Sequence, residues 1–376
     1  MINSILGFPI NFVRRKLMKR NESKRTEGKR VETKSNETKK NKNKKPVRKS
    51  FTGLKITLLT IAILIIYIVI IPASACKNLS GKAIDADKIT NPYITEEKAL
   101  VSAHRSGKDI APENTMAAFQ YCIETEDFNV DVFEFDLHIT KDGKLILLHD
   151  STLDRTTNSE EHFGKKNVTP SSKTYEELRE LNFGENFENE AGEYPYRGLR
   201  GADIPEELRA VLLEDVLDYL EGNGHFKYII EIKDAGENGK KACDELYRIL
   251  KEKELLDDVV FGTFNPDVTA YADKNYPDML RSASIMEVLT FYVLCGYGID
   301  VNEDFFKYEA LQIPTGYYGI ICLDTDRIIN YAHNHNIAVQ YWTINTASEV
   351  EYLNSIGADC IMSDAPDMAY DVINAE

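Results

Sequence analysis

The sequence predicts an α/β protein built on a (β/α)8 TIM barrel, with a small insertion after the second strand and one transmembrane helix in front. Strand-like and helix-like segments alternate from about residue 97 to the end of the 376-residue chain, which indicates a parallel sheet. Eight such strand segments suit a closed barrel. Twenty uncharged residues at 56–75 precede them and are long enough to cross a bilayer. A doubly wound open sheet is the alternative, but no GxGxxG or Walker pattern follows any strand.

Charge divides the chain into two unlike parts. Residues 1–50 hold 17 Lys and Arg against 4 Asp and Glu, although the net charge of the whole chain is −16. This pattern predicts a basic, disordered cytoplasmic tail over 1–50, a transmembrane signal-anchor helix over 51–75 and a linker over 76–96. We expect the tail to lie near anionic lipids. The protein would then be a single-pass protein of the cell membrane, with residues 97–376 on the extracytoplasmic side.

The sequence around Cys76 allows a second interpretation of this segment. The small residues of "ASAC" at 73–76 also suit signal-peptide cleavage followed by lipidation of the cysteine. Either arrangement tethers the globular part to the outer face of the membrane. Because that part is strongly acidic, it would repel phosphate over most of its surface, and we expect no nucleic-acid partner.

The elements of the barrel are expected in the following order. The first strand is predicted at 99–105, and a helix begins near residue 113. A hairpin-like pair follows at 132–139 and 145–148. Residues 151–210 are too many for a bare loop and predict an inserted subdomain. The remaining strands, each separated from the next by a helix, are predicted at 226–233, 259–264, 280–286, 310–314, 338–345 and 359–364.

Polar side chains gather where these strands end, which is the end of a barrel that carries active sites. Strand alternation places Glu134 and Asp136 on one face, and Glu231 joins them from a later strand. Three carboxylates form a hard oxygen site suited to one divalent cation, Ca²⁺ or Mg²⁺.

The same end of the predicted barrel carries cations, histidines and an aromatic residue. Arg105 and Lys233 suit an anionic group, and His104 and His149 suit proton transfer near neutral pH. Trp342 lies in the late strand predicted at 338–345. Positive partners beside a pair of histidines favour hydrolysis of a phosphodiester.

Five segments in this order resemble the signature blocks of the glycerophosphodiester phosphodiesterase family, which is related to the phosphatidylinositol phospholipase C barrels. They are "AHRSGKDIAPENTMAAF", "EFDLHITKDGKLILLHDSTLDRTTN", "EIK", "YWTIN" and "GADCIMSDAP". The resemblance implies a metal-dependent barrel that hydrolyses glycerophosphodiesters to an alcohol and glycerol 3-phosphate. It implies that His104 and His149 are catalytic and that Glu134, Asp136 and Glu231 bind metal. Arg105 and Lys233 would contact phosphate, and Trp342 would line the substrate site.

Two alternatives to this function differ in substrate or in class. The membrane tether would also suit a lysophospholipase D-type activity on lysolipids. A non-catalytic receptor for glycerophosphodiesters or wall polymers would use the same pocket, although binding alone does not need a pair of histidines. One position departs from the family pattern, since Ser106 stands where the family usually has Gly after His-Arg. Serine is costly there if the backbone requires a positive φ.

Overall fold

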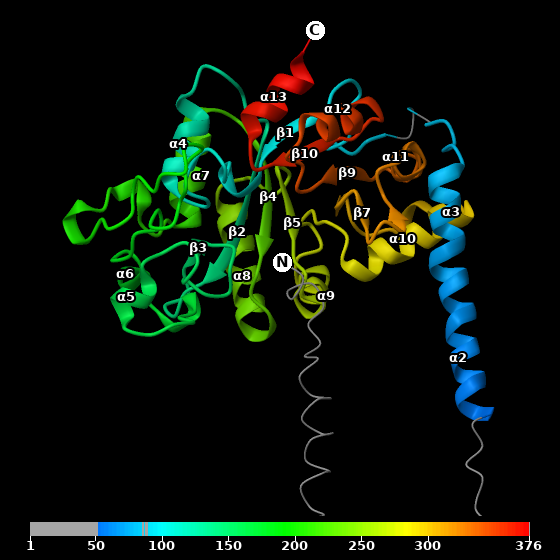
Figure 1. Cartoon of the computed structure of the whole chain (residues 1–376), viewed down its shortest axis with the longest axis horizontal. Coiled ribbons are helices and arrows are strands. Elements are labelled where there is room, and N and C mark those ends of the chain that lie inside the picture. Colours follow the sequence, from blue (N-terminus) through cyan, green and yellow to red (C-terminus); the bar gives the residue numbers. More distant parts are fainter. Residues whose placement is uncertain (1–51, 85, 87–88, 376) are drawn as a thin grey trace, which may run out of the picture. The chain divides into compact units, whose positions relative to one another are not determined.

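Seven parallel strands form a nearly closed barrel, which confirms the predicted fold class (Figure 1). The computed structural model describes residues 52–84, 86 and 89–375; the predicted tail at 1–50 lies outside these residues. The strand order is β5-β4-β2-β1-β10-β9-β6, and β3 pairs antiparallel with β2. Arg281 and Ser282 bridge Phe261 of β5 to Ala310 of β6 and so occupy the eighth position.

The strands are short, as is usual in barrels of this kind. Their bounds are β1 Leu100–Ala103, β2 Val132–Ile139, β3 Leu145–Leu147, β4 Lys227–Ile232, β5 Val259–Gly262, β6 Ala310–Ile313, β7 Gly316–Tyr317, β8 Ile321–Cys322, β9 Ala338–Tyr341 and β10 Cys360–Ser363. The helices that follow the barrel strands are α4 Met116–Glu124, α7 Leu213–Asn223, α8 Gly236–Glu252, α9 Pro266–Asn275, α10 Ile285–Tyr297, α11 Asp326–His333, α12 Ala347–Ser355 and α13 Pro366–Asn374.

The predicted strand at 280–286 is reduced to two bridging residues, because a helix begins earlier than its apolar pattern suggested. The side chain of Ser284 accepts from the backbone of Glu287, and the carboxylate of Glu287 accepts from the Ser284 N–H. This capping box satisfies backbone donors at the start of α10 and fixes that start at Ile285. Glu287 also accepts from the guanidinium of Arg281, at 2.8 and 2.9 Å. The extended segment is therefore pinned to the helix that ends it.

Period-2 alternation along β2 separates two kinds of side chain, although all eight residues of the strand are buried. Phe133, Phe135 and Leu137 face the helices and belong to the main apolar core. Val132 faces the other way, into a small cluster with Ile229, Cys360 and Met362. Glu134 and Asp136 share the face of Val132 and lie nearer the carboxyl end of the strand. The barrel interior is thus apolar toward the amino ends of the strands and charged at its mouth, where the strands have their carboxyl ends.

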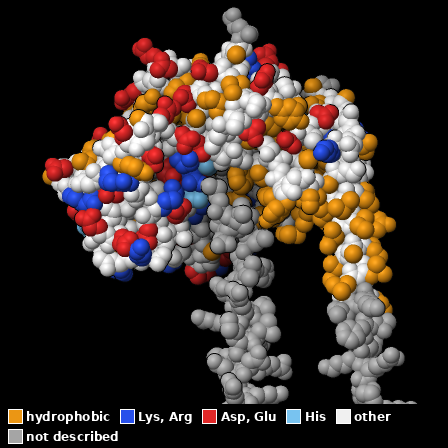
Figure 2. All heavy atoms as spheres, in the orientation of Figure 1, with side chains coloured by type: hydrophobic (Ala, Val, Ile, Leu, Met, Phe, Trp, Pro, Cys, Tyr) orange, Lys and Arg blue, Asp and Glu red, His pale blue; other side chains and the backbone are white. Residues whose placement is uncertain are grey.

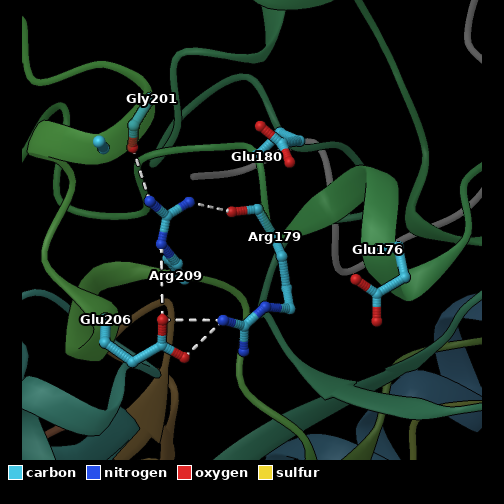
Figure 3. Close-up of a pocket in the computed structure, with 7 residues that line it drawn as sticks. Glu176, Arg179, Glu180, Gly201, Glu206 and Arg209 are labelled. Atoms are coloured by element: carbon cyan, nitrogen blue, oxygen red, sulfur yellow. Dashed lines mark hydrogen bonds and ion pairs between the residues drawn. The ribbon is translucent and has the colours of Figure 1, made fainter.

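The insertion between β3 and α7 has an apolar core of its own. It contains α5 Ser159–Phe163, α6 Tyr175–Leu178 and three short 3-10 turns, Pro170–Ser172, Gly201–Asp203 and Glu206–Leu208. Its buried members include Leu153, Val168, Leu178 and Leu181. Figure 3 shows a hollow in this insertion where Arg179 and Arg209 pair with Glu206. None of the predicted site residues lines that hollow.

One helix in the described part of the chain, Ile56–Asn78, is long and apolar enough to cross a membrane. It is part of a continuous helical segment made of α2 Thr52–Ile65, a π-helical turn at Ile66–Ile70 and α3 Ile71–Asn78, which ends three residues beyond the predicted end at 75. Its carboxyl end packs on α10, where a Cβ on Gly296 would lie only 2.5 Å from Cβ of Pro72. The hydroxyl of Tyr297 also donates to the carbonyl of Tyr67, at 2.8 Å.

Part of the segment expected to be a linker closes the amino-terminal end of the barrel. Tyr93 is 1% exposed and packs against Val260, Ala310 and Ala338 at the starts of three strands. The Asn91 amide donates to the carbonyl of Glu309 at 2.7 Å. This end is therefore filled with side chains, and the carboxyl end of the strands is the end left for a site.

Candidate active site

The strands bring the predicted site residues to one end of the barrel. His104 and Arg105 follow β1, Glu134 and Asp136 lie in β2, and His149 follows β3. Asp136 and Glu231 are direct cross-strand partners on β2 and β4. Lys233 follows β4 and Trp342 follows β9. The parallel register is what places these residues together.

The turn after β1 has an unusual backbone. Arg105, Ser106 and Gly107 all have positive φ, at 50°, 66° and 87°. This left-handed run turns the N–H of Arg105 toward Glu134, whose Oε2 accepts from it at 2.6 Å. The backbone at this position has a positive φ, which the glycine usual in the family adopts without strain. Ser106 adopts the same conformation at an energetic cost. The Ser106 hydroxyl is also buried without a hydrogen-bond partner among the described residues.

Replacing Ser106 by glycine is expected to stabilise the barrel by about 1 kcal/mol, because the change relieves left-handed strain and removes a buried unpaired hydroxyl. The flexibility of glycine in the unfolded chain offsets part of this gain. The thermal midpoint of S106G should rise by a few degrees. Asn167 is the matched control: its φ is 58°, but asparagine tolerates this region, so N167G should gain less. A lower midpoint for S106G would contradict this account of the turn.

His104 lies between two carboxylates. Its Nδ1 is 2.6 Å from Oδ1 of Asp364, and its Nε2 is 3.9 Å from Oε2 of Glu134. Burial opposes protonation of the ring, but the charge of Glu134 and the hydrogen bond to Asp364 raise the pKa of His104 above its ordinary value. The Nδ1 bond fixes the ring and directs Nε2 into the mouth.

Asp364 is a site residue that the sequence reasoning missed. It follows β10 directly, and that position after the last strand was the available signal. Besides His104, it accepts from the amide of Asn345 at 2.8 Å and pairs with Lys108 at 2.9 Å. Burial alone would raise the pKa of Asp364, yet the hydrogen bond and charge of His104 and the ammonium of Lys108 hold it well below the usual range. Asp364 is therefore an anion that orients the His104 ring.

The three predicted metal ligands form a buried acidic cluster. Burial and the charge of Asp136 raise the pKa of Glu134 to about 7. Burial also opposes ionisation of Asp136, but the positive charges of Lys233, His149 and Arg105 keep its pKa below the usual range. Burial raises the pKa of Glu231. Two carboxylates on one strand therefore differ in pKa, because neighbouring cations stabilise the charge of Asp136 better than that of Glu134.

Cationic side chains already contact this acidic cluster. Nζ of Lys233 lies 3.3 Å from Asp136 and 3.0 Å from Glu231. In the described residues, no group of three or more His, Cys, Asp or Glu stands in a geometry that would hold a metal ion. The donor chemistry nevertheless fits a hard divalent cation, since Glu134, Asp136 and Glu231 lie on two neighbouring strands and all supply carboxylate oxygens.

A polar network supports the second histidine. Nδ1 of His149 bonds to Asp150 at 2.8 Å, which leaves Nε2 as the basic nitrogen. Arg155 donates to Asp150 at 2.7 Å, and it donates two further hydrogen bonds of 2.6 and 2.7 Å to the carboxylate of Glu113. Glu113 in turn accepts from Arg105 at 3.3 Å. The sequence reasoning did not find Asp150 or Arg155, although both lie in the block that begins at Glu134.

Asn114 stabilises the acidic cluster rather than capping the next helix. Thr115 is the N-cap of α4, and its side chain accepts from Ala118 N–H. The Asn114 amide is thereby free to donate to Oδ2 of Asp136 at 3.0 Å, with Asn114 at φ 56°. The bond favours the charged form of Asp136.

The apolar side of the mouth is made of two aromatic rings. Trp342 is half-buried and packs against the apolar cluster inside the barrel. Its ring lies 6.2 Å from that of Phe264 at an edge-on angle of 80°. Phe264 also has the ammonium of Lys233 6.0 Å from its ring centre. The sequence reasoning named Trp342 but missed Phe264, which follows β5.

The model of the glycerophosphoryl diester phosphodiesterase family matches residues 104–368. The chain belongs to this family. It is therefore a phosphodiesterase, and the matched segment contains every predicted site residue. The chain is 27% identical over 277 residues to a glycerophosphodiester phosphodiesterase of Caldanaerobacter subterraneus subsp. tengcongensis, covering 73% of this chain and 98% of that one. It is 27% identical over 300 residues to the lysophospholipase D GDPD1 of Mus musculus, covering 72% and 85%.

Solved structures support the fold. A glycerophosphoryl diester phosphodiesterase domain from Mycobacterium tuberculosis superimposes with a TM-score of 0.57 at 17% identity, covering 73% of this chain and 99% of that one. A phosphodiesterase from Oleispira antarctica, solved with the product sn-glycerol-3-phosphate, gives a TM-score of 0.54 at 19% identity, covering 74% and 98%. At these identities the likeness concerns the barrel itself.

Proposed function

We propose that this protein hydrolyses glycerophosphodiesters to an alcohol and sn-glycerol 3-phosphate, as a membrane-anchored extracytoplasmic enzyme that depends on one divalent cation, Ca²⁺ or Mg²⁺. The observation that carries the proposal is the pair of histidines, each held by a carboxylate through Nδ1, at a mouth that also contains Arg105 and Lys233. The family membership and the names of its relatives support the same reaction.

The residues of the chain divide the reaction between them. Arg105 and Lys233 bind the phosphodiester anion. The Nε of Arg105 lies 3.8 Å from Asp136 but has no hydrogen-bond partner in the described part of the chain, so it would donate to a phosphoryl oxygen. One histidine takes a proton from the attacking oxygen as the new P–O bond forms. The attacker is either water, or the substrate's own glycerol hydroxyl, in which case water opens the resulting cyclic phosphate in a second step. The other gives a proton to the leaving alkoxide as the old P–O bond breaks. Trp342 packs against the apolar part of the substrate.

Glu134, Asp136 and Glu231 would hold the cation. When bound, it would neutralise charge that develops on the phosphoryl oxygens. Burial and the charge of Asp136 raise the pKa of Glu134, and the charge of the cation would oppose both, so its binding is expected to release a proton near neutral pH. In that case affinity for the cation rises with pH through about 7, where Glu134 loses its proton.

Treatment with a chelator is expected to reduce turnover of glycerophosphocholine at least ~10²-fold, and Ca²⁺ or Mg²⁺ should restore it. An E231Q variant should need a higher cation concentration for half-maximal rate, because it loses one charged ligand. An E237Q variant is the matched control, since Glu237 is an exposed carboxylate paired with Lys240. Unchanged turnover in chelator would remove the metal from the proposal.

Tight binding of glycerophosphocholine without turnover, with Ca²⁺ or Mg²⁺ present, would favour a receptor instead of an enzyme.

We propose that the barrel lies on the extracytoplasmic side of the membrane, because the helix at Ile56–Asn78 follows a basic segment that would stay in the cytoplasm. Protease added to intact cells should then digest the barrel. Protection until the cells are opened would place it in the cytoplasm.

A further inference from the structure

The exposed apolar side chains of the barrel are concentrated on one side. Residues 97–375 have eleven large hydrophobic side chains that are exposed, and eight of them lie between positions 264 and 320. On the surface of a soluble protein, exposed hydrophobic side chains are usually scattered singly. Their concentration here indicates a surface that contacts another molecule or a membrane. The eight are Phe264, Ile285, Met286, Tyr297, Ile299, Phe305, Tyr318 and Ile320.

Five of the eight lie at the mouth, and we call these the apolar rim. Phe264 comes two residues after β5 ends, and Ile285 and Met286 form the first turn of α10, just after the bridging residue Ser282. Tyr318 and Ile320 occupy the turn between β7 and β8, which follows β6. Loops at the carboxyl ends of barrel strands surround the active site. The most exposed member, Tyr318, is 84% exposed.

The apolar rim begins inside the candidate active site. Phe264 contacts Trp342 edge-on and has the Lys233 ammonium 6.0 Å from its ring centre, yet 48% of its surface is exposed. Phe264 therefore connects Lys233, the side chain proposed to bind phosphate, with the exposed surface. A substrate with its phosphodiester at Lys233 would have an apolar path outward over Phe264.

The other end of this surface continues into the apolar helix. The helix α10, which carries Met286 at its start, packs at its end on Pro72 and binds the Tyr67 carbonyl through Tyr297. Figure 2 shows hydrophobic side chains gathered on this side of the barrel and on the helix. The residues of Ile56–Ile71 are largely exposed, as a surface that meets lipid would be. One apolar surface thus runs from the helix through α10 to the mouth.

We propose that the apolar rim rests on the bilayer that the helix at Ile56–Asn78 enters, and that the enzyme takes its substrate from this surface. The substrate would be a glycerophosphodiester lipid with one acyl chain, a lysophospholipid whose chain stays at the membrane while its phosphodiester reaches Lys233. Tyrosine and aliphatic side chains are the types favoured at the boundary between lipid and water. This inference rests on the proposed function and adds the substrate class to it.

Contact with lipid can be measured by fluorescence, since Trp342 is the single tryptophan of the chain. The full-length Y318W variant, reconstituted in nanodiscs, should lose at least half of its added emission when the lipids carry brominated chains. Y121W is the matched control, because Tyr121 is 50% exposed on α4, which follows β1 rather than the strands that carry the rim. Equal quenching of the two variants, after subtraction of the Trp342 signal, would overturn the proposal.

The substrate class is tested by activity in the same nanodiscs. A Y318E/I320E variant should hydrolyse lysophosphatidylcholine at least ~10-fold more slowly and glycerophosphocholine at the unchanged rate, while Y121E should change neither. An equal effect on both substrates would overturn the lipid proposal. Turnover of glycerophosphocholine by a protein whose rim is not quenched would remove the rim proposal and keep the proposed function. Quenching of the rim without turnover of either substrate would remove the proposed function.

Discussion

H149A is expected to lower kcat by roughly 10²–10⁴-fold, the usual contribution of a group that transfers a proton in the transition state. His149 is suited to this role because Asp150 fixes its Nδ1, and its side chain is 29% exposed at the mouth. H104A should cause a loss of the same order, since His104 has the same kind of carboxylate partner. The measurement is the steady-state rate on glycerophosphocholine at saturating substrate, with the thermal midpoint recorded for each variant.

The matched control for both histidines is H225A. His225 is also paired with carboxylates, Glu221 and Asp258, but it is exposed and lies before β4, at the opposite end of the barrel. This variant should keep the full rate. Full activity in H149A would remove His149 from proton transfer and leave its network with Arg155 as a purely structural feature.

K233M is expected to destabilise the barrel by about 3–5 kcal/mol, because it leaves two buried carboxylates without the cation that contacts both. Asp136 is 1% exposed, and Glu231 and Lys233 are largely buried, so solvent screens these charges little. The thermal midpoint of the full chain in detergent should fall by roughly 6–15 °C. K240M is the matched control, because Lys240 pairs with Glu237 on the exposed side of α8, and it should show no comparable change.

The effect of K233M should depend on pH in a definite direction. In the intact protein the pKa of Asp136 lies below its unfolded value, so its charge stabilises the fold above about pH 4, and that contribution is lost as the pH falls through the folded pKa. Without Lys233 this stabilisation is weakened. The loss in midpoint should therefore be largest near neutral pH and should shrink in acid. Because the change falls below about pH 4, a loss that is equal at roughly pH 2 and pH 7 would contradict the assignment to buried charge.

The sequence was sufficient for the parts of the fold that local patterns determine. Alternation along 132–139 identified both the strand and the shared face of Glu134 and Asp136, and the structure shows that face at the mouth. Parallel register then explains why Glu231, known only as a residue in another strand, is the direct partner of Asp136. The helix start at Ile285 was also local in origin, since Ser284 and Glu287 form its capping box, but the apolar run that follows hid it.

The features that sequence reasoning missed depend on contacts between distant residues. Asp364 is 260 positions from His104, and no local pattern says that its carboxylate faces that ring. Tyr93 was assigned to a linker because its burial comes from strands more than 160 residues away. The apolar rim also escaped notice. Phe264 follows β5, Met286 lies in the first turn of α10, and Tyr318 lies in the turn between β7 and β8, so only the closed barrel brings them to one mouth.

Identification of the products released from glycerophosphocholine by the full-length protein tests the central claim most directly. The account predicts sn-glycerol 3-phosphate and choline in equal amounts, with the phosphate on glycerol, and no product from an H104A/H149A double variant. Release of phosphocholine and glycerol would mean that the other P–O bond is cleaved, and product formation by the double variant would mean that the histidines do no chemistry. Either result would contradict the active site described for this barrel.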